Sequence, residues 1–452
     1  MSGPPGFICM GPPLQRMTRR LQRVFTGGRV LASAERWAVG VTFFVNGVVI
    51  GTFASRLPWI AGRLHLTSGT LGLVGLTTSV GALVTMPFAA QFVHRYGPRA
   101  TTRVLIIASS AAIVLPAVAP SLLVLAVMML IFGALSGIND NAMNAQAVEA
   151  EQRIGRSIMS GLHGMWSLGV LAGSLIGSLS ARAHLDPVAQ FAVVGAVAAA
   201  AGGISSLWFG GQAPAASADV EVPWFAWPRG TLLLIGLVGF AAIFVEFAAN
   251  DWSAVFMHWD LHSSQATAAI ATGAFAGSMA AGRLCGDALV RRIGPGVSVR
   301  ACGVLGTAGC LLVAVSPDLA AALAGFIMIG LGVSVVVPLV FAAAGRSGPS
   351  PAIGVAGVAT VSYGAGMAAP SVMGGVADVS SLRIAFAVAA LLAIGVAAGA
   401  RLLDLEHAER PGRGLEEDQL HRGDDADQHH EDPQRQRRQL AAEPGPEQAT
   451  ER

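Results

Sequence analysis

The sequence predicts an all-α membrane protein with twelve transmembrane helices arranged as two pseudo-symmetric six-helix halves. Of its 452 residues, 53% are hydrophobic and only 12% are charged. Its apolar residues also fall into runs of about 20, the length that a helix needs to cross a bilayer. Soluble domains carry about 25% charged residues. A soluble globular protein is therefore excluded, and we expect the lipid bilayer to surround most of the chain.

Six apolar runs make up the first half of the predicted fold. Each is expected to be a helix, because lipid cannot pair with a free backbone N–H or C=O. Breaks at Pro58, Gly97-Pro98, Pro120 and Asp186-Pro187 separate most of the runs. The runs cover residues 37–56, 68–92, 103–119, 121–148, 157–181 and 187–209.

The second half repeats this count and spacing. Its runs are divided at Asp260, Gly294-Pro295, Pro317, the turn around Pro349 and Asp378. They cover residues 231–257, 264–289, 298–316, 319–345, 351–377 and 382–402.

This pattern divides the chain into five parts. We expect residues 1–36 to form a cytosolic N-terminal extension, in which Met10 or Met17 is an alternative start. Two helical bundles follow at residues 37–209 and 231–402, joined by a polar, proline-containing cytosolic linker at 210–230. Residues 403–452 hold 14 acids and 7 arginines. Such a composition is typical of a disordered charged tail.

The arginines predict the orientation in the membrane. The chain has no lysine, and its arginines concentrate in the N-terminal segment and the even-numbered loops. Cytoplasmic loops are enriched in basic residues, so we expect a multi-pass protein of the bacterial inner membrane with both termini in the cytoplasm. The net charge is only +2, which argues against a nucleic-acid partner.

Two loops share one pattern and indicate an internal duplication. The segments that begin at Arg95 and Arg292 both read R-x-G-P-x4-R and lie 197 residues apart. The same offset aligns further pairs, namely Gly133 with Gly330, Trp166 with Tyr363, and Gly177 with Gly374. Agreement over several segments predicts duplicated halves.

The first of these loops, Ala90 to Arg99, resembles the signature G-x-x-x-D-R-x-G-R-R of the major facilitator superfamily. Ala90, His94 and Pro98 depart from that pattern. The resemblance covers about residues 35–402 and implies alternating access of two halves around a central cavity. It also implies a cytosolic latch between the halves, formed by Arg95, Gly97, Arg292 and Gly294.

Three shorter pieces resemble one bacterial branch of that superfamily. They are Ser55-Arg56-Leu57-Pro58, the segment Ala142 to Glu149, and Asn250-Asp251-Trp252-Ser253. The branch contains inner-membrane proteins of unassigned substrate, rhizopine-associated proteins and, more distantly, fucose permeases. This resemblance implies a small polar solute of sugar or polyol type. We expect a monomer.

Polar and aromatic residues inside the apolar runs are the candidates for solute binding. Amides and hydroxyls bind polar solutes, and aromatic rings stack on sugar-like faces. Helix-to-helix hydrogen bonding or packing is the alternative role for each of them. The candidates are Asn46, Asn141, Asn144, His163, Trp166, Asn250 and Tyr363.

Three acids are the candidates for proton coupling. A charge near the bilayer centre costs about 3 kcal/mol on insertion scales, so each is a functional candidate. Glu246 is the first choice, with Asp140 second and Asp251 third. No arginine lies in the middle turns of their own segments, and we expect no cationic neighbour for Glu246 or Asp140. Arg283 and Asp287, four residues apart, are expected to form a structural ion pair.

Enzyme motifs, cofactor motifs and clustered metal ligands are not found in the sequence, so an enzyme is not expected. The first hypothesis is a proton-coupled secondary active transporter. The alternative is a membrane protein of the same fold that does not transport and acts as a sensor or scaffold. The solute, the coupling ion, the direction of transport and the role of the tail stay open.

Overall fold

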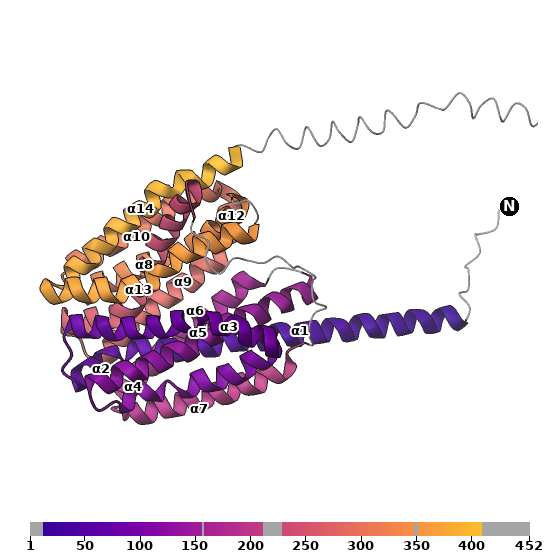
Figure 1. Cartoon of the computed structure of the whole chain (residues 1–452), viewed down its shortest axis with the longest axis horizontal. Helices are drawn as coiled ribbons and strands as arrows, with labels where there is room; N and C mark the ends of the chain where they lie inside the picture. The colour runs from indigo at the N-terminus through magenta and orange to yellow at the C-terminus, as the bar shows by residue number, and fades with distance from the viewer. Residues whose placement is uncertain (1–11, 156–157, 211–227, 348–350, 409–452) are drawn as a thin grey trace, which may run out of the picture. The chain divides into compact units, whose positions relative to one another are not determined.

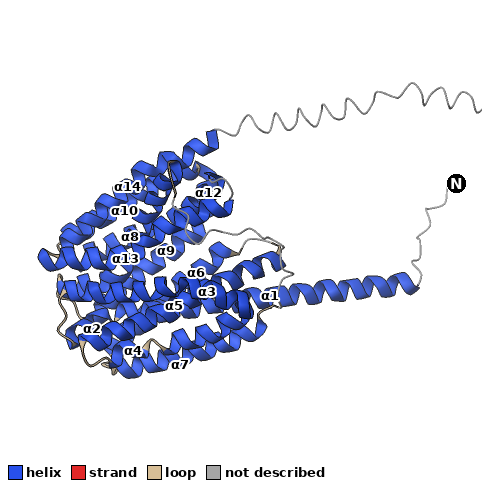
Figure 2. Ribbon diagram, viewed as in Figure 1, coloured by secondary structure: helices blue, strands red, loops and turns tan. Residues whose placement is uncertain are grey.

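A computed structural model describes residues 12–155, 158–210, 228–347 and 351–408, and these are almost entirely helical (Figures 1 and 2). Much of the predicted linker and tail therefore lies outside the described residues, as do residues 1–11. The helices are α1 Pro12–Ser55, α2 Leu57–Arg63, α3 Ser68–Ala111, α4 Val114–Val118, α5 Leu122–Ile154, α6 Met159–Arg182, α7 Pro187–Ser205, the short 3-10 helix η1 Ser206–Trp208, α8 Thr231–Trp259, α9 Gln265–Ile293, α10 Pro295–Val315, α11 Leu319–Val333, α12 Val336–Ser347, α13 Pro351–Val379 and α14 Leu382–Ala408.

Twelve membrane crossings can be traced in the described part of the chain. Ten segments are long and apolar enough to span a bilayer. Helix α3 supplies parts of two of them, because Gly97 breaks its helical geometry, and α11 and α12 together form another. The remaining crossings are α9 and α13, which have 29 residues each and are therefore about 44 Å long. The predicted all-α membrane fold is confirmed.

Side-chain caps begin several of these helices where the sequence turns polar. Thr67 accepts the N–H of Thr70 at the start of α3. Asp186 and Asp318 accept the N–H groups of Ala189 and Ala321, at 2.7 and 2.9 Å, at the starts of α7 and α11. Each cap satisfies a backbone donor that has no partner within its own helix. The helix starts therefore fall where the sequence places Thr, Ser or Asp.

The backbone repeats at the offset seen in the sequence. Gly97 has φ 78° and ψ 154°, and Gly294 has φ 81° and ψ 162°. Both R-x-G-P loops thus make the same turn, with a positive φ that glycine adopts without strain. A Cβ on Gly133 would lie 2.0 Å from the Thr78 carbonyl oxygen, and one on Gly330 would lie 2.5 Å from that of Phe275. Thr78 and Phe275 are also 197 residues apart, so the repeat extends to the helix contacts.

Helices α1–α7 and α8–α14 form two neighbouring groups in Figure 1. We call the end of the bundle that carries Arg95, Arg153 and Arg292 the arginine-rich end. The other end, which carries α2 and the turns before α3 and α9, is the opposite end. Figure 1 shows α2 and α4 on the left and α12 on the right.

The two groups of helices are joined by hydrogen bonds at the opposite end. The N–H of Gly69 on α3 donates to Asp378 of α13 at 3.1 Å, and Ser178 of α6 donates to the carbonyl of Ala266 on α9 at 2.7 Å. Arg56 adds a longer contact of 3.4 Å to Gln265. Nearer the arginine-rich end, the Tyr363 side chain on α13 is 51% exposed. At the opposite end the two groups of helices are therefore in direct contact.

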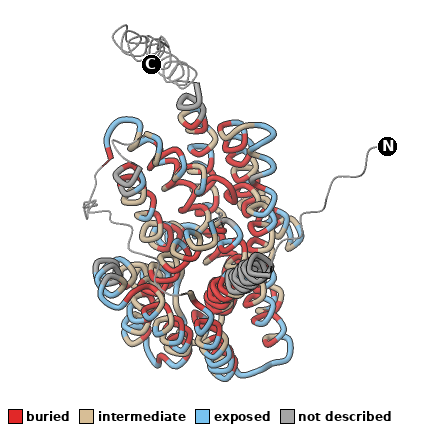
Figure 3. The backbone as a smooth tube through the Cα atoms, turned by 90° about the vertical axis from the view of Figure 1, so that its right-hand side faces the viewer, coloured by how far each residue is buried: buried red, intermediate tan, exposed pale blue. Residues whose placement is uncertain are grey.

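Buried residues line the inner faces of the helices, and exposed residues follow the outside (Figure 3). Many of the exposed side chains are large and apolar. Leu123 and Val315, for example, are 75% and 72% exposed. Such an apolar exterior is expected of a surface that faces lipid. The outer surface of the helices therefore matches the lipid environment that the composition predicts.

Gly133 offers a test of the close packing between α3 and α5. We expect Gly133→Ala to lower the melting temperature of the purified protein, because its Cβ has no space and overpacking costs about 1–3 kcal/mol. Gly375→Ala on α13 is the matched control, since no atom lies within 4 Å of its Cβ position. Equal melting temperatures for the two variants would contradict the packing described.

Candidate functional site

The centre of the site is Arg283 on α9, which contacts residues of both halves. Its Nη2 donates to Glu246 Oε1 on α8 at 3.1 Å, and its Nη1 donates to Ser167 Oγ on α6 at 2.8 Å. The Arg283 and Glu246 side chains are only 11% and 16% exposed. A single guanidinium thus connects an acid of the second half to a hydroxyl of the first.

This ion pair corrects one expectation from the sequence. The prediction that Glu246 lacks a cationic neighbour is wrong, because Arg283 reaches it from the adjacent helix. The sequence shows only pairs on one helix face, whereas Glu246 and Arg283 are 37 residues apart. The Asp287 side chain, the partner expected for Arg283, lies outside the described residues.

Asn46, Trp166 and His163 come together where α1 packs against α6. Trp166 Nε1 donates to Asn46 Oδ1 at 2.9 Å. The His163 ring packs edge-on against Phe43, with centroids 5.6 Å apart, and lies within electrostatic range of Arg283. Glycines allow this approach, since a Cβ on Gly47 would lie 2.1 Å from the Trp166 carbonyl. The predicted aromatic and amide residues therefore adjoin the arginine.

Asp140 and Tyr363 lie across the space between the halves. Asp140 on α5 is exposed and accepts a hydrogen bond from Asn144 Nδ2 at 3.3 Å. Its carboxyl group lies within electrostatic range of the Tyr363 hydroxyl on α13. Asn141 instead donates to the carbonyl of Gly137 within its own helix. The structure thus brings Asp140, Asn144 and Tyr363 toward one another.

The other candidates on α8 interact locally. Asn250 is 9% exposed and donates to the carboxylate of its neighbour Asp251 at 2.8 Å. In the part of the chain that the structure describes, Asp251 has no ion pair. Glu246 and Asn250 are four residues apart on the same helix. Their side chains nevertheless hydrogen-bond to different partners, Arg283 and Asp251.

The predicted latch residues lie at the arginine-rich end. Arg95 and Arg292 are both exposed, and the Arg95 guanidinium lies 5.5 Å from the centroid of the Tyr96 ring. Gly97 and Gly294 form the equivalent turns beside them. The latch itself stays a prediction.

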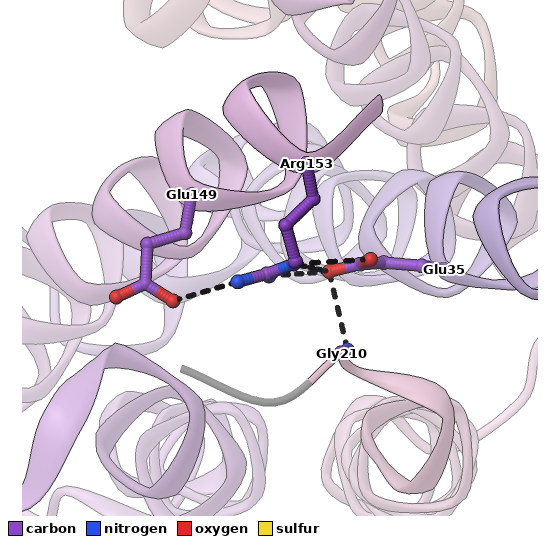
Figure 4. A network of polar contacts seen from close by, with 4 residues as sticks. All are labelled: Glu35, Glu149, Arg153 and Gly210. Atoms are coloured by element: carbon purple, nitrogen blue, oxygen red, sulfur yellow. Dashed lines mark hydrogen bonds and ion pairs between the residues drawn. The ribbon is translucent and has the colours of Figure 1, made fainter. Parts of the chain in front are cut away.

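Two polar groups could not be recognised in the sequence. Near the arginine-rich end, Arg153 pairs with Glu35 and Glu149, and Glu35 also accepts the N–H of Gly210 (Figure 4). Glu35 lies two residues before the first apolar run, where an acid is expected to be a solvent-exposed flanking residue.

The second such group surrounds Arg56, which is only 2% exposed. Its Nε and Nη2 donate to Gln190 Oε1 at 2.8 and 2.6 Å, which joins α7 to the end of α1. In the sequence, the S-R-L-P segment carries only a family resemblance. The structure gives Arg56 a structural role: its guanidinium is buried, and a buried cation needs hydrogen-bond acceptors, which Gln190 supplies.

The arrangement of polar and aromatic side chains is suited to binding a polar solute. Within the described ranges, no group of three or more His, Cys, Asp or Glu side chains could hold a metal ion. What the helices bring together is a charged pair, amides, hydroxyls and aromatic rings between two halves. Such a set can hydrogen-bond a polar solute and stack on its apolar faces.

Comparison with known proteins agrees with this geometry. The family model of the Major Facilitator Superfamily matches residues 39–370. An uncharacterized MFS-type transporter of Yersinia pestis is 34% identical over 81% of this chain and 95% of its own length. The uncharacterized transporter y4wD of Sinorhizobium fredii is 32% identical, over 72% of this chain and 86% of its own length. The membrane protein MosC of Rhizobium meliloti is 28% identical, over 72% and 79%.

Solved structures share the fold at low sequence identity. The nucleoside transporter NupG superposes with a TM-score of 0.65 at 15% identity, covering 81% of this chain and 99% of its own. The E. coli fucose:proton symporter FucP gives a TM-score of 0.57 at 16% identity, covering 81% and 98%. The resemblance inferred from the loop motif and the three shorter pieces is confirmed. With its repeated loops, its central arginine and the family match across most of the helices, the chain belongs to the major facilitator superfamily.

Proposed function

We propose that the protein is a secondary active transporter that moves a small polar solute across the bacterial inner membrane by alternating access. The observation that carries this proposal is the position of Arg283. It links Ser167 of the first half to Glu246 of the second, so movement of the halves must change its hydrogen bonds. At the opposite end the halves are also joined by the hydrogen bonds of Gly69 and Ser178, and alternating access would have to break these contacts.

The residue types around Arg283 and Asp140 support a sugar-like or polyol-like solute. Asn46, Asn144 and Tyr363 offer hydrogen-bonding groups, while Trp166 and His163 offer ring faces. Sugars need both, since hydroxyl groups and apolar ring faces alternate on them. One of the structural neighbours, FucP, is a symporter of fucose and protons. In this proposal Asn141 and Asn250 support the site through contacts within their own helices. Among the described residues, no contact favours the alternative role as a sensor or scaffold.

Orientation and assembly complete the proposal. By the distribution of arginines, the arginine-rich end faces the cytoplasm and both termini lie on that side. In this orientation, the hydrogen-bonded opposite end lies on the side away from the cytoplasm. We propose that a monomer is the working unit, because each half completes the cavity of the other.

Glu246 is the proposed site of proton coupling, with Asp140 and Asp251 as the other candidates. Protonation of Glu246 would remove the charge that balances Arg283. An unpaired guanidinium in a low-dielectric site is unfavourable by several kcal/mol. Arg283 would then need a new partner, such as a solute hydroxyl or water, and would hold Ser167 differently. Proton binding is thereby tied to the contact between the halves.

Solute uptake into proteoliposomes tests this coupling. We expect Glu246→Gln to abolish proton-driven accumulation and to preserve solute exchange, since glutamine can still accept a hydrogen bond from Arg283 but cannot gain a proton. Asp186→Asn, at an exposed helix cap of the opposite end, should accumulate solute like the wild type. Normal accumulation by a folded, inserted Glu246→Gln protein would exclude Glu246 as the coupling acid.

The latch at the arginine-rich end gives a separate prediction. If Arg95 and Arg292 help to close this end, Arg95→Gln or Arg292→Gln should keep the cavity open there. A cysteine reporter at position 363 should then react faster with a thiol reagent supplied from the cytoplasmic side. Arg291→Gln is the control, as an exposed arginine next to the repeated motif. The latch is refuted if all three variants label at the wild-type rate.

A further inference from the structure

The contact between Asp378 and the start of α3 joins the two halves at the opposite end. Asp378 stands one residue before the end of α13, and its Oδ1 accepts the Gly69 N–H at 3.1 Å. The Thr67 side chain also lowers the pKa of this carboxylate. Helix α3 has 44 residues, and its first N–H groups carry the positive end of the helix dipole. A carboxylate of one half thus caps a helix of the other.

Small residues bring the two helices together below this cap. A Cβ on Gly69 would lie 2.8 Å from the Asp378 carboxyl carbon, and one on Gly72 would lie 2.5 Å from the Pro370 carbonyl oxygen. Deeper in the bundle, Ser79 Oγ donates to the carbonyl of Gly366 at 2.7 Å. The close packing of α3 against α13 therefore continues from Asp378 toward the middle of the bundle.

The equivalent position of the repeat lacks this carboxylate. At the offset of 197 residues, Asp378 corresponds to Ala181 of α6, and Gly69 corresponds to Ala266 of α9. There the halves meet through the neutral hydrogen bond from Ser178. The described ion pairs at the arginine-rich end, from Arg153 to Glu35 and Glu149, lie within the first half. At the opposite end, the charged contact between helix ends of the two halves therefore comes from one repeat only.

We propose that Asp378 and the N-terminus of α3 form a gate latch, which holds the opposite end closed and sets the resting balance between the two access states. This inference rests on the alternating access proposed above. The latch must break each time the opposite end opens, because its two partners belong to different halves. It acts on the conformational equilibrium and not on the solute.

Solvent reaches the latch from the opposite end. Thr67, Ser68 and Asp378 line a pocket of about 670 Å³ together with His258, Trp259 and His262. The titratable groups that line this pocket with Asp378 are His258 and His262, and Asp260 lies within electrostatic range of both His262 and Arg383. The Asp378 carboxylate can therefore exchange protons with the medium on that side.

The pH dependence follows from the Gly69 N–H, which together with Thr67 lowers the pKa of Asp378 below its ordinary value. A lowered pKa means that the ionised carboxylate favours the closed state. This contribution is complete above the ordinary pKa of about 4 and is lost as the pH falls through the lower value of the closed state. Between about pH 5 and 8, Asp378 should hold the latch at constant strength.

The test measures the gate directly. Spin labels at positions 123 and 315, on exposed residues of different halves at the opposite end, report its width in nanodiscs without added solute. The four native cysteines are replaced by alanine. We expect Asp378→Asn to raise the ratio of open to closed populations about two- to fivefold, the effect of losing a charge at a helix N-terminus. Gly69→Ala should act in the same direction, because its Cβ displaces the carboxylate.

Asp318→Asn is the matched control, because Asp318 caps α11 at the same end but within one half. It should leave the population ratio unchanged. An equal shift in this control, or no shift in both latch variants, would overturn the latch. Lowering the pH to about 3 should open the wild type more than Asp378→Asn, since histidine titration is common to both.

The distances between the two spin labels also distinguish a failure of the latch from a failure of the proposed function. A wild type that shows one gate width under every condition, including a saturating solute, contradicts alternating access itself. A wild type with two widths and an unaltered balance in Asp378→Asn contradicts only the latch.

Discussion

The need to pair a charge inside the membrane determines how this bundle is built around Arg283. An arginine at this depth is unfavourable by several kcal/mol unless it has partners. Those partners come from α8 and α6, so three helices must meet at the guanidinium. The chain has no lysine, and Arg283 is the arginine that pairs with Glu246.

Close helix packing makes this pairing geometrically feasible. Gly47, Gly133 and Gly330 each place a helix backbone where a Cβ would overlap a neighbouring carbonyl group. Dispersion contacts and short interhelical distances hold helices together in lipid, where the hydrophobic effect gives no preference for protein neighbours. Because Gly133 and Gly330 are repeat partners, both halves have inherited the same rigid scaffold. Chemical differences between the halves therefore reside in a few polar side chains.

The sequence predicts the fold well because lipid imposes strict rules. Apolar length and the loop prolines locate the spans, and the R-x-G-P loops reveal the repeat that Gly97 and Gly294 share in their backbone angles. The candidate site is harder to predict. Asn46 and Trp166 are separate candidates in the sequence and form a hydrogen bond, but the pairing of Glu246 with Arg283 depends on helix rotation and on contacts 37 residues apart. Arg56 and Glu35 lie at the ends of apolar runs, where burial cannot be inferred from composition.

A difference between the contacts at its two ends gives such a scaffold a preferred access state. If both ends were closed by equivalent contacts, the two access states would have equal energy. Here the loop at His94 and Pro98 departs from the family signature at the arginine-rich end, whereas Asp378 supplies a carboxylate at the opposite end. The repeat partner of Asp378 is Ala181 at the same end, so the carboxylate is present in one half only. A single charged cap on one of two related helices is enough to favour one state by a factor of a few. The central ion pair can then change that balance when Glu246 gains or loses its proton.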